Sequence, residues 1–374
     1  MTTTLLIVGL VRGAAWARDI SKTDDLSIAG LVEIDAEKLA RVGDELGVPP
    51  ERRYVDFDRA LEAEADIVVV ATPPALHKEM SLAALRAGHH VICEKPVTRD
   101  LAEARALREA VRASDRRFMV GEQYRFADGC ENLRRAVAEG LIGRPVYLAH
   151  EFGRAGGPGA HPSPSRSLRS LDLGGGPGDH PSPRPSRPAQ RPAGQDTSPH
   201  GHIPGMSVHH FDMWWYITGR RPVEIRADPI VPPGDGSGRP LGYSMRATLE
   251  DGLHVQYFDR RALARPQTTW YGDLWVVGDE GALFWNGVGS AVTLSRSLPT
   301  HDYREQHLAS GPVSFVSRDA SGGATMLMVR ALVEAIRQGR PHPCDMEDNW
   351  VSFATAMAAV ESAQTGQAVK VERG

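Results

Sequence analysis

Short β-rich runs alternate with amphipathic helical stretches over the first third of the chain, and this alternation constrains the fold more than any other feature. Five strands are predicted, at residues 5–8, 28–33, 67–71, 90–93 and 118–122. Between them, apolar residues at helical spacing predict helices over 36–47 and 101–113. Strands that alternate with helices form a parallel sheet covered on both faces. We therefore expect a doubly wound α/β sheet of the Rossmann type over residues 1–123.

Beyond residue 124, strand-like runs follow one another directly. Helices are predicted over 131–139, 324–338 and 347–364, and strands over 146–152, 223–230, 244–249, 254–258, 274–277 and 282–285. This order predicts a second, α+β domain over residues 124–374, built on a largely antiparallel open sheet. An open sheet leaves one broad face uncovered, and a second subunit would cover it. We therefore expect a homodimer or a homotetramer.

Residues 155–205 fit neither pattern. These 51 residues hold 11 of the 27 prolines and 10 of the 38 glycines, and no Lys, Glu, Val, Phe, Tyr, Trp or Met. Because Gly and Pro together exceed the roughly 25 to 30% typical of disordered segments, we expect disorder here. A structureless loop of this length is uncommon inside a domain, so out-of-frame translation between two compensating coding shifts is the alternative. The coding-shift alternative fails if neither of the other two reading frames encodes a peptide with the pattern of a globular protein over this segment.

Charge and composition exclude several classes of function. The 43 basic and 47 acidic side chains give a formal charge of −4, which attracts no polyanion, so nucleic acid is not an expected partner. Apolar runs such as residues 67–71 are far shorter than the roughly 18 residues of a membrane span. The run at 5–11 lacks a preceding basic residue and is interpreted as a strand, not a signal peptide. Three cysteines suit a reducing compartment, so we expect a cytoplasmic protein, and we expect no metal site.

The first predicted strand leads through a turn into a helix that starts near Gly13. Glycines allow a tight turn at such a place, and the helix N-terminus offers N–H groups to a pyrophosphate. Aligned on Gly9, the three glycine positions are Gly9, Val11 and Ala14; alternatively, one residue is missing and Gly13 is the third glycine. We place Gly9, Val11, Arg12 and Gly13 in a dinucleotide site. A strand, turn and helix without a ligand is the competing interpretation.

Glu33 ends the second predicted strand, 24 residues after Gly9. A carboxylate at this place accepts hydrogen bonds from the ribose hydroxyls of an adenosine and repels a 2′-phosphate. NAD is therefore favoured over NADP as the cofactor. Asp35 competes for the same role, and a solvated acidic turn before the helix would account for both carboxylates without a ligand.

Polar residues follow the third and fourth strands, where ligands bind in open α/β sheets. The third strand is followed by Thr72, Pro73 and His77, and the fourth by Glu94 and Lys95. Packing explains a lysine directly after a buried strand poorly, since Lys is almost never buried unpaired. Partial desolvation would lower its pKa and suit an amine that exchanges a proton with a substrate hydroxyl. The alternative is that Glu94 and Lys95 form a surface ion pair.

With these residues in place, the chain resembles the Gfo/Idh/MocA group of NAD(P)-dependent sugar and polyol dehydrogenases. The resemblance covers nearly the whole chain outside 155–205. The segments that carry it are Glu94-Lys95-Pro96, residues 71–73 with His77, and residues 121–126, 207–212 and 278–283.

The resemblance implies hydride transfer between a carbinol carbon of a sugar or cyclic polyol and a nicotinamide. Lys95 and His209 match the catalytic lysine and histidine of the family. Substrate contacts are expected at Arg125, His210 and Asp212. Cofactor contacts are expected at Thr72, Pro73, His77, Glu94, Lys95 and Gln123. The competing interpretation of the two histidines is that they cap a helix or pack between domains.

One position departs from the family pattern. Relatives carry an Asp four residues before the histidine, on the same helix face, but this chain has Gly205 there. Positioned acid-base help is typically worth 10² to 10⁴ in rate, so its loss would leave a slow enzyme or a dinucleotide-binding regulator. An NAD-dependent glycosidase, which oxidises its substrate transiently beside the anomeric carbon, is a further alternative. Asp212 is the other candidate for orienting His209.

Overall fold

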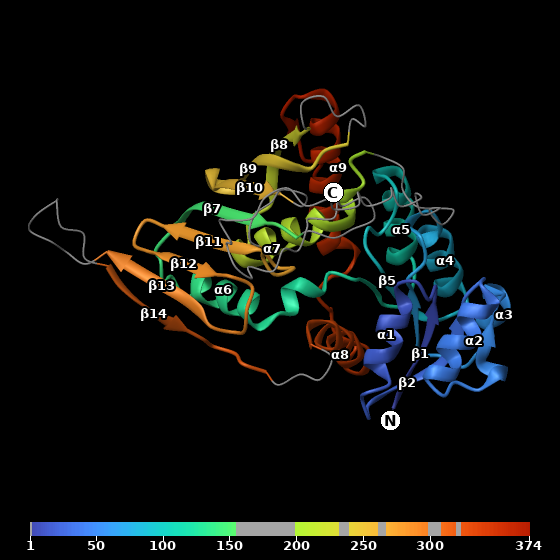
Figure 1. The fold of residues 1–374 in the computed structure, drawn as a ribbon. Coiled ribbons are helices and arrows are strands. Elements are labelled where there is room, and N and C mark those ends of the chain that lie inside the picture. The colour runs from blue at the N-terminus through green and yellow to red at the C-terminus, as the bar shows by residue number, and fades with distance from the viewer. Residues whose placement is uncertain (1, 155–198, 232–238, 261–266, 298–307, 319–322) are drawn as a thin grey trace, which may run out of the picture.

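The computed structural model describes residues 2–154, 199–231, 239–260, 267–297, 308–318 and 323–374 (Figure 1). Two sheets organise these residues, one in each half of the chain. The composition anomaly and its coding-shift alternative fall mainly on residues 155–198, which lie outside the described residues. Among the described residues, no helix is both long and apolar enough to cross a membrane.

The first sheet is the predicted doubly wound parallel sheet, with strand order β3-β2-β1-β4-β5-β6. The ends of the five predicted strands differ from the observed ends by at most two residues; β3 has only two residues and was not predicted. The strands are β1 (Thr3–Val8), β2 (Leu26–Val32), β3 (Arg53–Tyr54), β4 (Ile67–Val70), β5 (His90–Cys93) and β6 (Phe118–Val120). The helices are α1 (Gly13–Ile20), α2 (Ala36–Glu45), α3 (Phe57–Ala60), α4 (Pro74–Arg86) and α5 (Leu101–Arg112), with the 3-10 turn η1 (Pro50–Arg52).

Side chains of this sheet alternate between two buried layers. Leu5, Ile7 and Val69 pack on the side of α1 and α2, whereas Leu6 and Val68 pack on the side of α4 and α5. Every residue of β4 is fully buried. This double burial explains why the strands are uninterrupted apolar runs, as is typical of parallel sheets.

The second sheet has the strand order β14-β13-β12-β11-β7-β10-β9-β8-β15 over the described residues. Its pairs are antiparallel except β7 with β10, so the predicted open, largely antiparallel sheet is confirmed. The predicted strands are β7 (Pro145–Phe152), β8 (Pro222–Ile230), β9 (Gly242–Leu249), β10 (His254–Asp259), β11 (Asp273–Gly278) and β12 (Ala282–Trp285). Strands β13 (Val292–Ser297), β14 (Leu308–Val313) and β15 (Val369–Lys370) were not predicted, and η4 (Glu250–Gly252) is a short turn before β10.

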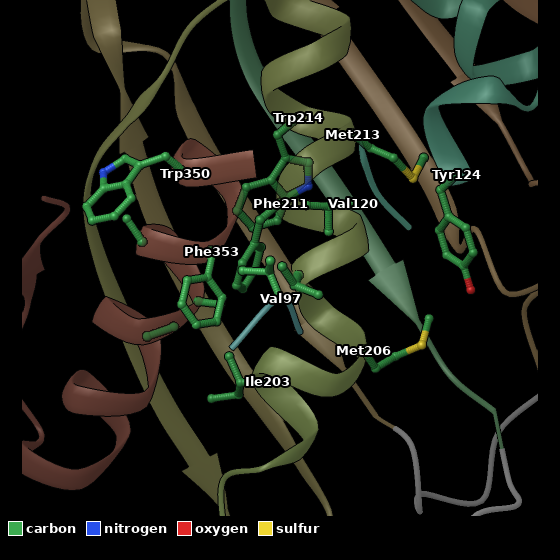
Figure 2. Close-up of a cluster of buried hydrophobic side chains, with 14 of the residues drawn as sticks. Val97, Val120, Tyr124, Ile203, Met206, Phe211, Met213, Trp214, Trp350 and Phe353 are labelled. Carbon is green, nitrogen blue, oxygen red and sulfur yellow. The ribbon is translucent and has the colours of Figure 1, made fainter. Parts of the chain in front are cut away.

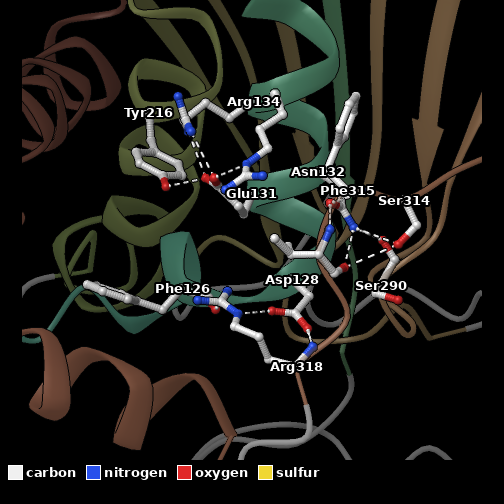
Figure 3. A network of polar contacts seen from close by, with 12 residues as sticks. Phe126, Asp128, Glu131, Asn132, Arg134, Tyr216, Ser290, Ser314, Phe315 and Arg318 are labelled. Carbon is white, nitrogen blue, oxygen red and sulfur yellow. Dashed lines mark hydrogen bonds and ion pairs between the residues drawn. The ribbon is translucent and has the colours of Figure 1, made fainter.

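Helices α6 (Asp128–Ala138) and α7 (Val208–Thr218) lie beside the second sheet (Figure 1). A polar network fixes α6: the Glu131 carboxylate accepts from Arg134, Arg135 and Tyr216, the last of these on α7 (Figure 3). On the opposite side of α6, Asn132 donates to the Ser290 and Val316 carbonyl oxygens and accepts from the Phe315 and Val316 amides. These bonds join α6 to the segments that flank β13 and β14.

The two C-terminal helices follow one another in the sequence but pack in different parts of the structure. Helix α8 (Gly323–Gln338) was assigned with the second domain, but Met326 and Val329 pack into the layer that holds Leu5 and Ile7 of the first sheet. An ion pair of 2.9 Å between Arg330 and Asp25 reinforces this contact. Helix α9 (Met346–Thr365) runs between the two sheets, and it contacts α5, α7 and β8 (Figure 1).

The prediction of disorder is wrong for residues 199–205. Residues Ile203–Ser207 form the π-helical turn η3, which continues directly into α7, and Ile203 is fully buried. His200 hydrogen-bonds the Tyr243 hydroxyl at 3.0 Å. The Gly and Pro content gave the wrong prediction here, because one large apolar residue and two backbone turns are enough to hold so short a segment in place.

A hydrophobic cluster fastens α7 between the two domains (Figure 2). Phe211 and Trp214 of α7 are fully buried, with ring centroids 4.7 Å apart. The cluster also contains Val97 and Val120 of the first domain and Phe353 of α9. Helix α7, which carries His209, therefore packs against both domains.

Candidate active site

The turn after β1 has the geometry of a phosphate site. Gly9 has φ +87°, and a Cβ there would lie 2.8 Å from the Ala71 carbonyl oxygen, so only glycine fits. The Gly13 amide donates to the Gly9 oxygen at 2.9 Å, and α1 begins at Gly13. No side chain caps this helix, whose N-cap residue is Arg12. Its N-terminal N–H groups and positive dipole end therefore face the turn and suit an anion.

Glu33 lies beside this turn. Its carboxylate is buried and accepts from the Leu10 amide at 2.9 Å and from the Asp35 amide at 3.3 Å. Asp35, the competing candidate, caps α2 by accepting from the Lys38 amide at 3.0 Å. The Lys38 ammonium lies 3.5 Å from Glu33 and offsets part of its negative charge. Glu33 is thus the carboxylate nearer the turn.

Two predicted cofactor residues carry buried polar atoms without a hydrogen-bond partner among the described residues. They are Thr72 Oγ1, just beyond β4, and Gln123 Oε1, in the 3-10 turn η2 (Gln123–Phe126) after β6. Buried polar atoms are normally paired, so each such exception needs an explanation. Both atoms follow parallel strands at their carboxyl ends, where a bound dinucleotide would supply the missing partners. These residues therefore fit a dinucleotide.

The side chains of His77 and Glu94 are buried close to the carboxyl ends of β4 and β5, where the candidate site lies. The ring nitrogens of His77 lie 2.8 Å from the carbonyl oxygens of Pro96 and Thr72, so this side chain ties together the loops after β4 and β5. Burial lowers the pKa of His77. Glu94 is 3% exposed and accepts from Arg12 Nε at 3.0 Å and Trp16 Nε1 at 2.8 Å. The alternative of a surface pair between Glu94 and Lys95 is wrong.

Lys95 and His209 reach the candidate site from different domains. The Lys95 ammonium donates to the Gly205 carbonyl oxygen in η3, and burial lowers the pKa of Lys95. His209 stacks on Tyr124, with ring centroids 4.2 Å apart and planes at 20°. Burial and the nearby Lys95 charge hold the pKa of His209 well below its usual value. The structure thus brings the two predicted catalytic residues within electrostatic reach of each other.

Glu122 belongs to the site, although no role was predicted for it from the sequence. Its carboxylate hydrogen-bonds His209 Nδ1 and accepts from Asn349 Nδ2 at 3.4 Å. Burial raises the pKa of Glu122 to about 8, against the opposing effects of Lys95 and Arg125. The available signal was a carboxylate directly after a buried strand, inside a segment already singled out. Tyr124 was missed in the same segment.

The three predicted substrate contacts are engaged elsewhere. Arg125 pairs with Asp212 at 2.8 Å and with Asp348 at 2.9 Å, and Ser352 donates to Asp212 at 2.8 Å. The side chains of Arg125 and Asp212 are 2% and 0% exposed. This network joins η2, α7 and α9, so Arg125 and Asp212 bond to each other and to α9, and their substrate contacts stay a prediction. Asp212 consequently does not orient His209, whose Nδ1 bonds Glu122 instead.

His210 also has both ring nitrogens occupied. Nδ1 bonds the Tyr257 hydroxyl at 2.7 Å and Nε2 donates to the Trp270 carbonyl oxygen at 3.0 Å. Burial holds the pKa of His210 well below its usual value. His210 therefore fits the competing interpretation, in which the histidine packs inside the protein, whereas His209 lies at the candidate site. Among the described residues, no group of three or more His, Cys, Asp or Glu side chains is arranged to hold a metal ion.

Fold and site together define a class of protein: an α/β chain with a dinucleotide-type turn on a Rossmann sheet, and with an amine and an imidazole that come from its two domains. Residues 4–122 match the sequence profile of a family described as an oxidoreductase family with an NAD-binding Rossmann fold. This family, the Gfo/Idh/MocA oxidoreductases, is the one that the resemblance named, and the match covers the first domain.

Similar proteins align with almost the whole chain. The 1,5-anhydro-D-fructose reductase of Ensifer adhaerens is 25% identical over 351 residues, which are 93% of this chain and 92% of that protein. The myo-inositol 2-dehydrogenase of Thermotoga maritima is 23% identical over 374 residues, 98% of each. The structure of scyllo-inositol dehydrogenase from Lactobacillus casei, with NAD(H) and scyllo-inositol, matches with a TM-score of 0.73 and 21% identity over 99% of both chains. At this identity, the structural match supports the fold.

Proposed function

We propose that the protein is an NAD-dependent oxidoreductase that transfers a hydride between a carbinol carbon of a sugar or cyclic polyol and the cofactor. The observation that carries this proposal is the contact of Lys95 with η3, the turn that leads into His209, beside strand ends where Thr72 and Gln123 carry unpartnered atoms. The dehydrogenase and reductase names of the full-length relatives support the substrate class.

In this proposal, the first domain holds the dinucleotide. Gly9, Gly13 and the N-terminus of α1 would bind the pyrophosphate, and Glu33 would accept from the adenosine ribose. Thr72 and Gln123 would pair their buried oxygens with the remainder of the cofactor. Bound NAD supplies a nicotinamide ring that accepts a hydride. NAD is preferred because the Glu33 carboxylate would repel a 2′-phosphate, although Lys38 weakens this repulsion.

The chain's own residues handle the proton. His209 Nε2 has no partner among the described residues, so it is free to accept the proton of a substrate hydroxyl. The Lys95 ammonium would donate to the same substrate oxygen and stabilise negative charge that develops on it. In the reverse direction, the same two groups return a proton to a carbonyl oxygen.

The test is to incubate purified protein with NAD and a panel of sugars and inositols while NADH absorbance is followed. Reduction of NAD by at least one polyol is expected. NAD binding without turnover by any member of the panel would instead favour the dinucleotide-binding regulator. Release of a leaving group from glycosides without net NADH would favour the glycosidase.

A further inference from the structure

The position of the missing acid is open space in this protein. Gly205 lies in η3, which continues into α7, so it precedes His209 by about one helical turn. A Cβ at Gly205 would have no heavy atom within 4 Å. The Gly205 carbonyl oxygen accepts a hydrogen bond from Lys95. No carboxylate therefore reaches His209 from its own helix at this position.

A carboxylate reaches His209 from the other domain instead. Glu122 follows β6, and its Oε2 hydrogen-bonds His209 Nδ1, with the two side chains 0% and 2% exposed. Tyr124 stacks on the imidazole and restricts rotation of its ring. With Nδ1 held and one ring face covered, Nε2 is the imidazole nitrogen left without a partner among the described residues.

Glu122 is itself held in place. Asn349 of α9 donates to its second oxygen at 3.4 Å, and the Cys344 thiol lies 3.7 Å from its carbonyl oxygen. A carboxylate buried this deeply is costly unless it is paired, and a packing role alone would be served better by an apolar side chain.

We propose that Glu122 is the positioning residue of His209, and that it supplies from the first domain the acid that position 205 lacks. This inference rests on the proposed function. During oxidation, the carbinol C–H and O–H bonds break, a C=O bond forms, the hydride pair goes to bound NAD, and the hydroxyl proton goes to His209 Nε2. Glu122 keeps its hydrogen bond to Nδ1–H and stabilises the resulting imidazolium, which then releases its proton to solvent.

The pair has an acid form and a base form. With two protons it presents Nε2–H, which suits ketone reduction; with one proton it presents a free Nε2 lone pair, which suits alcohol oxidation. Burial raises the pKa of Glu122 to about 8, while burial and Lys95 lower the pKa of His209. The other charged groups that face this pair are Glu94, Arg12, Arg125 and Asp212. Oxidation should therefore rise through about pH 8, and reduction should fall over the same range.

The decisive variant is Glu122→Gln. We expect kcat for oxidation to fall roughly 10²-fold or more, with NAD affinity and KM little changed. The inflection of the pH profile should move from about 8 to below 6.5, because His209 then titrates without a carboxylate partner. Glu131→Gln is the matched control: it also removes a buried carboxylate, which bonds Arg134, Arg135 and Tyr216 and not His209, and it should leave the pH profile unchanged. A wild-type rate and profile in Glu122→Gln would overturn the proposal.

A second-site variant tests the same idea by restoring the acid. In a Glu122→Ala background, Gly205→Asp should recover at least about tenfold in kcat, because the new carboxylate has room on the same helix face as His209. Gly205→Ala in that background is the control and should recover nothing. Equal recovery by Ala and Asp would show that helix stiffening, and not the acid, is responsible, and would count against the proposal.

A readout independent of turnover separates this inference from the proposed function. ¹⁵N NMR, with the His209 signals assigned by their loss in His209→Asn, should show the Nδ1–H tautomer above the inflection pH in the wild type. Glu122→Ala should shift the ring toward the Nε2–H tautomer. If the tautomer shifts but no polyol is oxidised, the dehydrogenase function fails and the positioning role stands. If polyols are oxidised but the tautomer does not respond, the positioning role fails.

Discussion

At the scale of single residues, the central assignment is Lys95, a lysine placed directly after a buried strand with its ammonium on the Gly205 carbonyl oxygen. In the proposed function the amine donates to the substrate oxygen, so Lys95→Ala should lower kcat by roughly 10² to 10⁴ while it spares NAD binding. Stopped-flow NADH formation and NAD titration measure the two quantities. Lys78→Ala, at a solvent-exposed pair with Glu79, is the control. Wild-type turnover in Lys95→Ala would mean that Lys95 is not catalytic.

Glu33 governs cofactor choice in this account. Glu33→Ala should weaken NAD several-fold and NADP less or not at all, because the substitution removes both a ribose acceptor and the repulsion of a 2′-phosphate. Affinities for both dinucleotides, from fluorescence titration, give the comparison. Asp35→Ala removes the neighbouring carboxylate and only a helix cap, worth about 1 kcal/mol, so it should leave the preference intact. Equal weakening of both cofactors by Glu33→Ala would argue against the ribose contact.

The sequence alone reveals those residues whose role depends on their neighbours in the chain. Lys95 and Glu33 follow strands, and strand ends are where ligands bind in this fold. The partner of His209 was not predictable in this way, because Glu122 lies 87 positions away and the packing of α7 against η2, the turn after Glu122, brings the two together. The ion pair between Arg125 and Asp212 was not predictable for the same reason, because it is a tertiary contact.

At the scale of elements, α6 depends on the carboxylate of Glu131. Burial raises the pKa of this group, but hydrogen bonds from Arg134, Tyr216 and Arg135 outweigh burial and lower the pKa to about 2 (Figure 3). Its stabilising effect is therefore complete above the ordinary carboxyl pKa near 4.3 and is lost as pH falls toward about 2. Glu131→Gln should lower the free energy of unfolding by about 1 to 2 kcal/mol at neutral pH.

Urea unfolding of wild type and Glu131→Gln at several pH values measures this effect. The difference between them should be constant from neutral pH down to about pH 5 and should shrink below about pH 4. Glu139→Gln, on the exposed last turn before the loop, is a control with no ion pair assigned to it among the described residues. A difference that stays the same at every pH would contradict the ionic origin of the stabilisation.

Periodicity predicted the long apolar strands, but it missed α4 and several short or turn-rich strands. Strand β4 is an unbroken apolar run, and α9 is long and flanked by an Asp cap and a Gly stop, so both were predicted. Strands β3 and β15 have two residues each, too few for a pattern, and β14 contains Gly and Pro, which mark turns in a sequence. These strands exist because a neighbouring strand offers free backbone groups.

At the scale of the whole molecule, the outer face of the second sheet bears aromatic side chains. Tyr147 and Trp275 are 39% and 41% exposed, and Trp275 stacks on Phe284 with centroids 4.4 Å apart. We propose that a second subunit covers this face. Trp275→Asp should then weaken association by about 2 kcal/mol or more, since buried aromatic residues dominate such contacts. Sedimentation velocity should detect a wild-type dimer or tetramer and a larger monomer fraction in the variant; a monomeric wild type would refute the proposal.

The most direct test of the account is a crystal structure of the protein with NAD and a polyol that it oxidises. Lys95 Nζ and His209 Nε2 should both lie within about 3.5 Å of one substrate hydroxyl oxygen, whose carbon faces the nicotinamide. A substrate bound with that carbon away from the nicotinamide, or with the two groups on different sides and no hydroxyl between them, would contradict the proposed function.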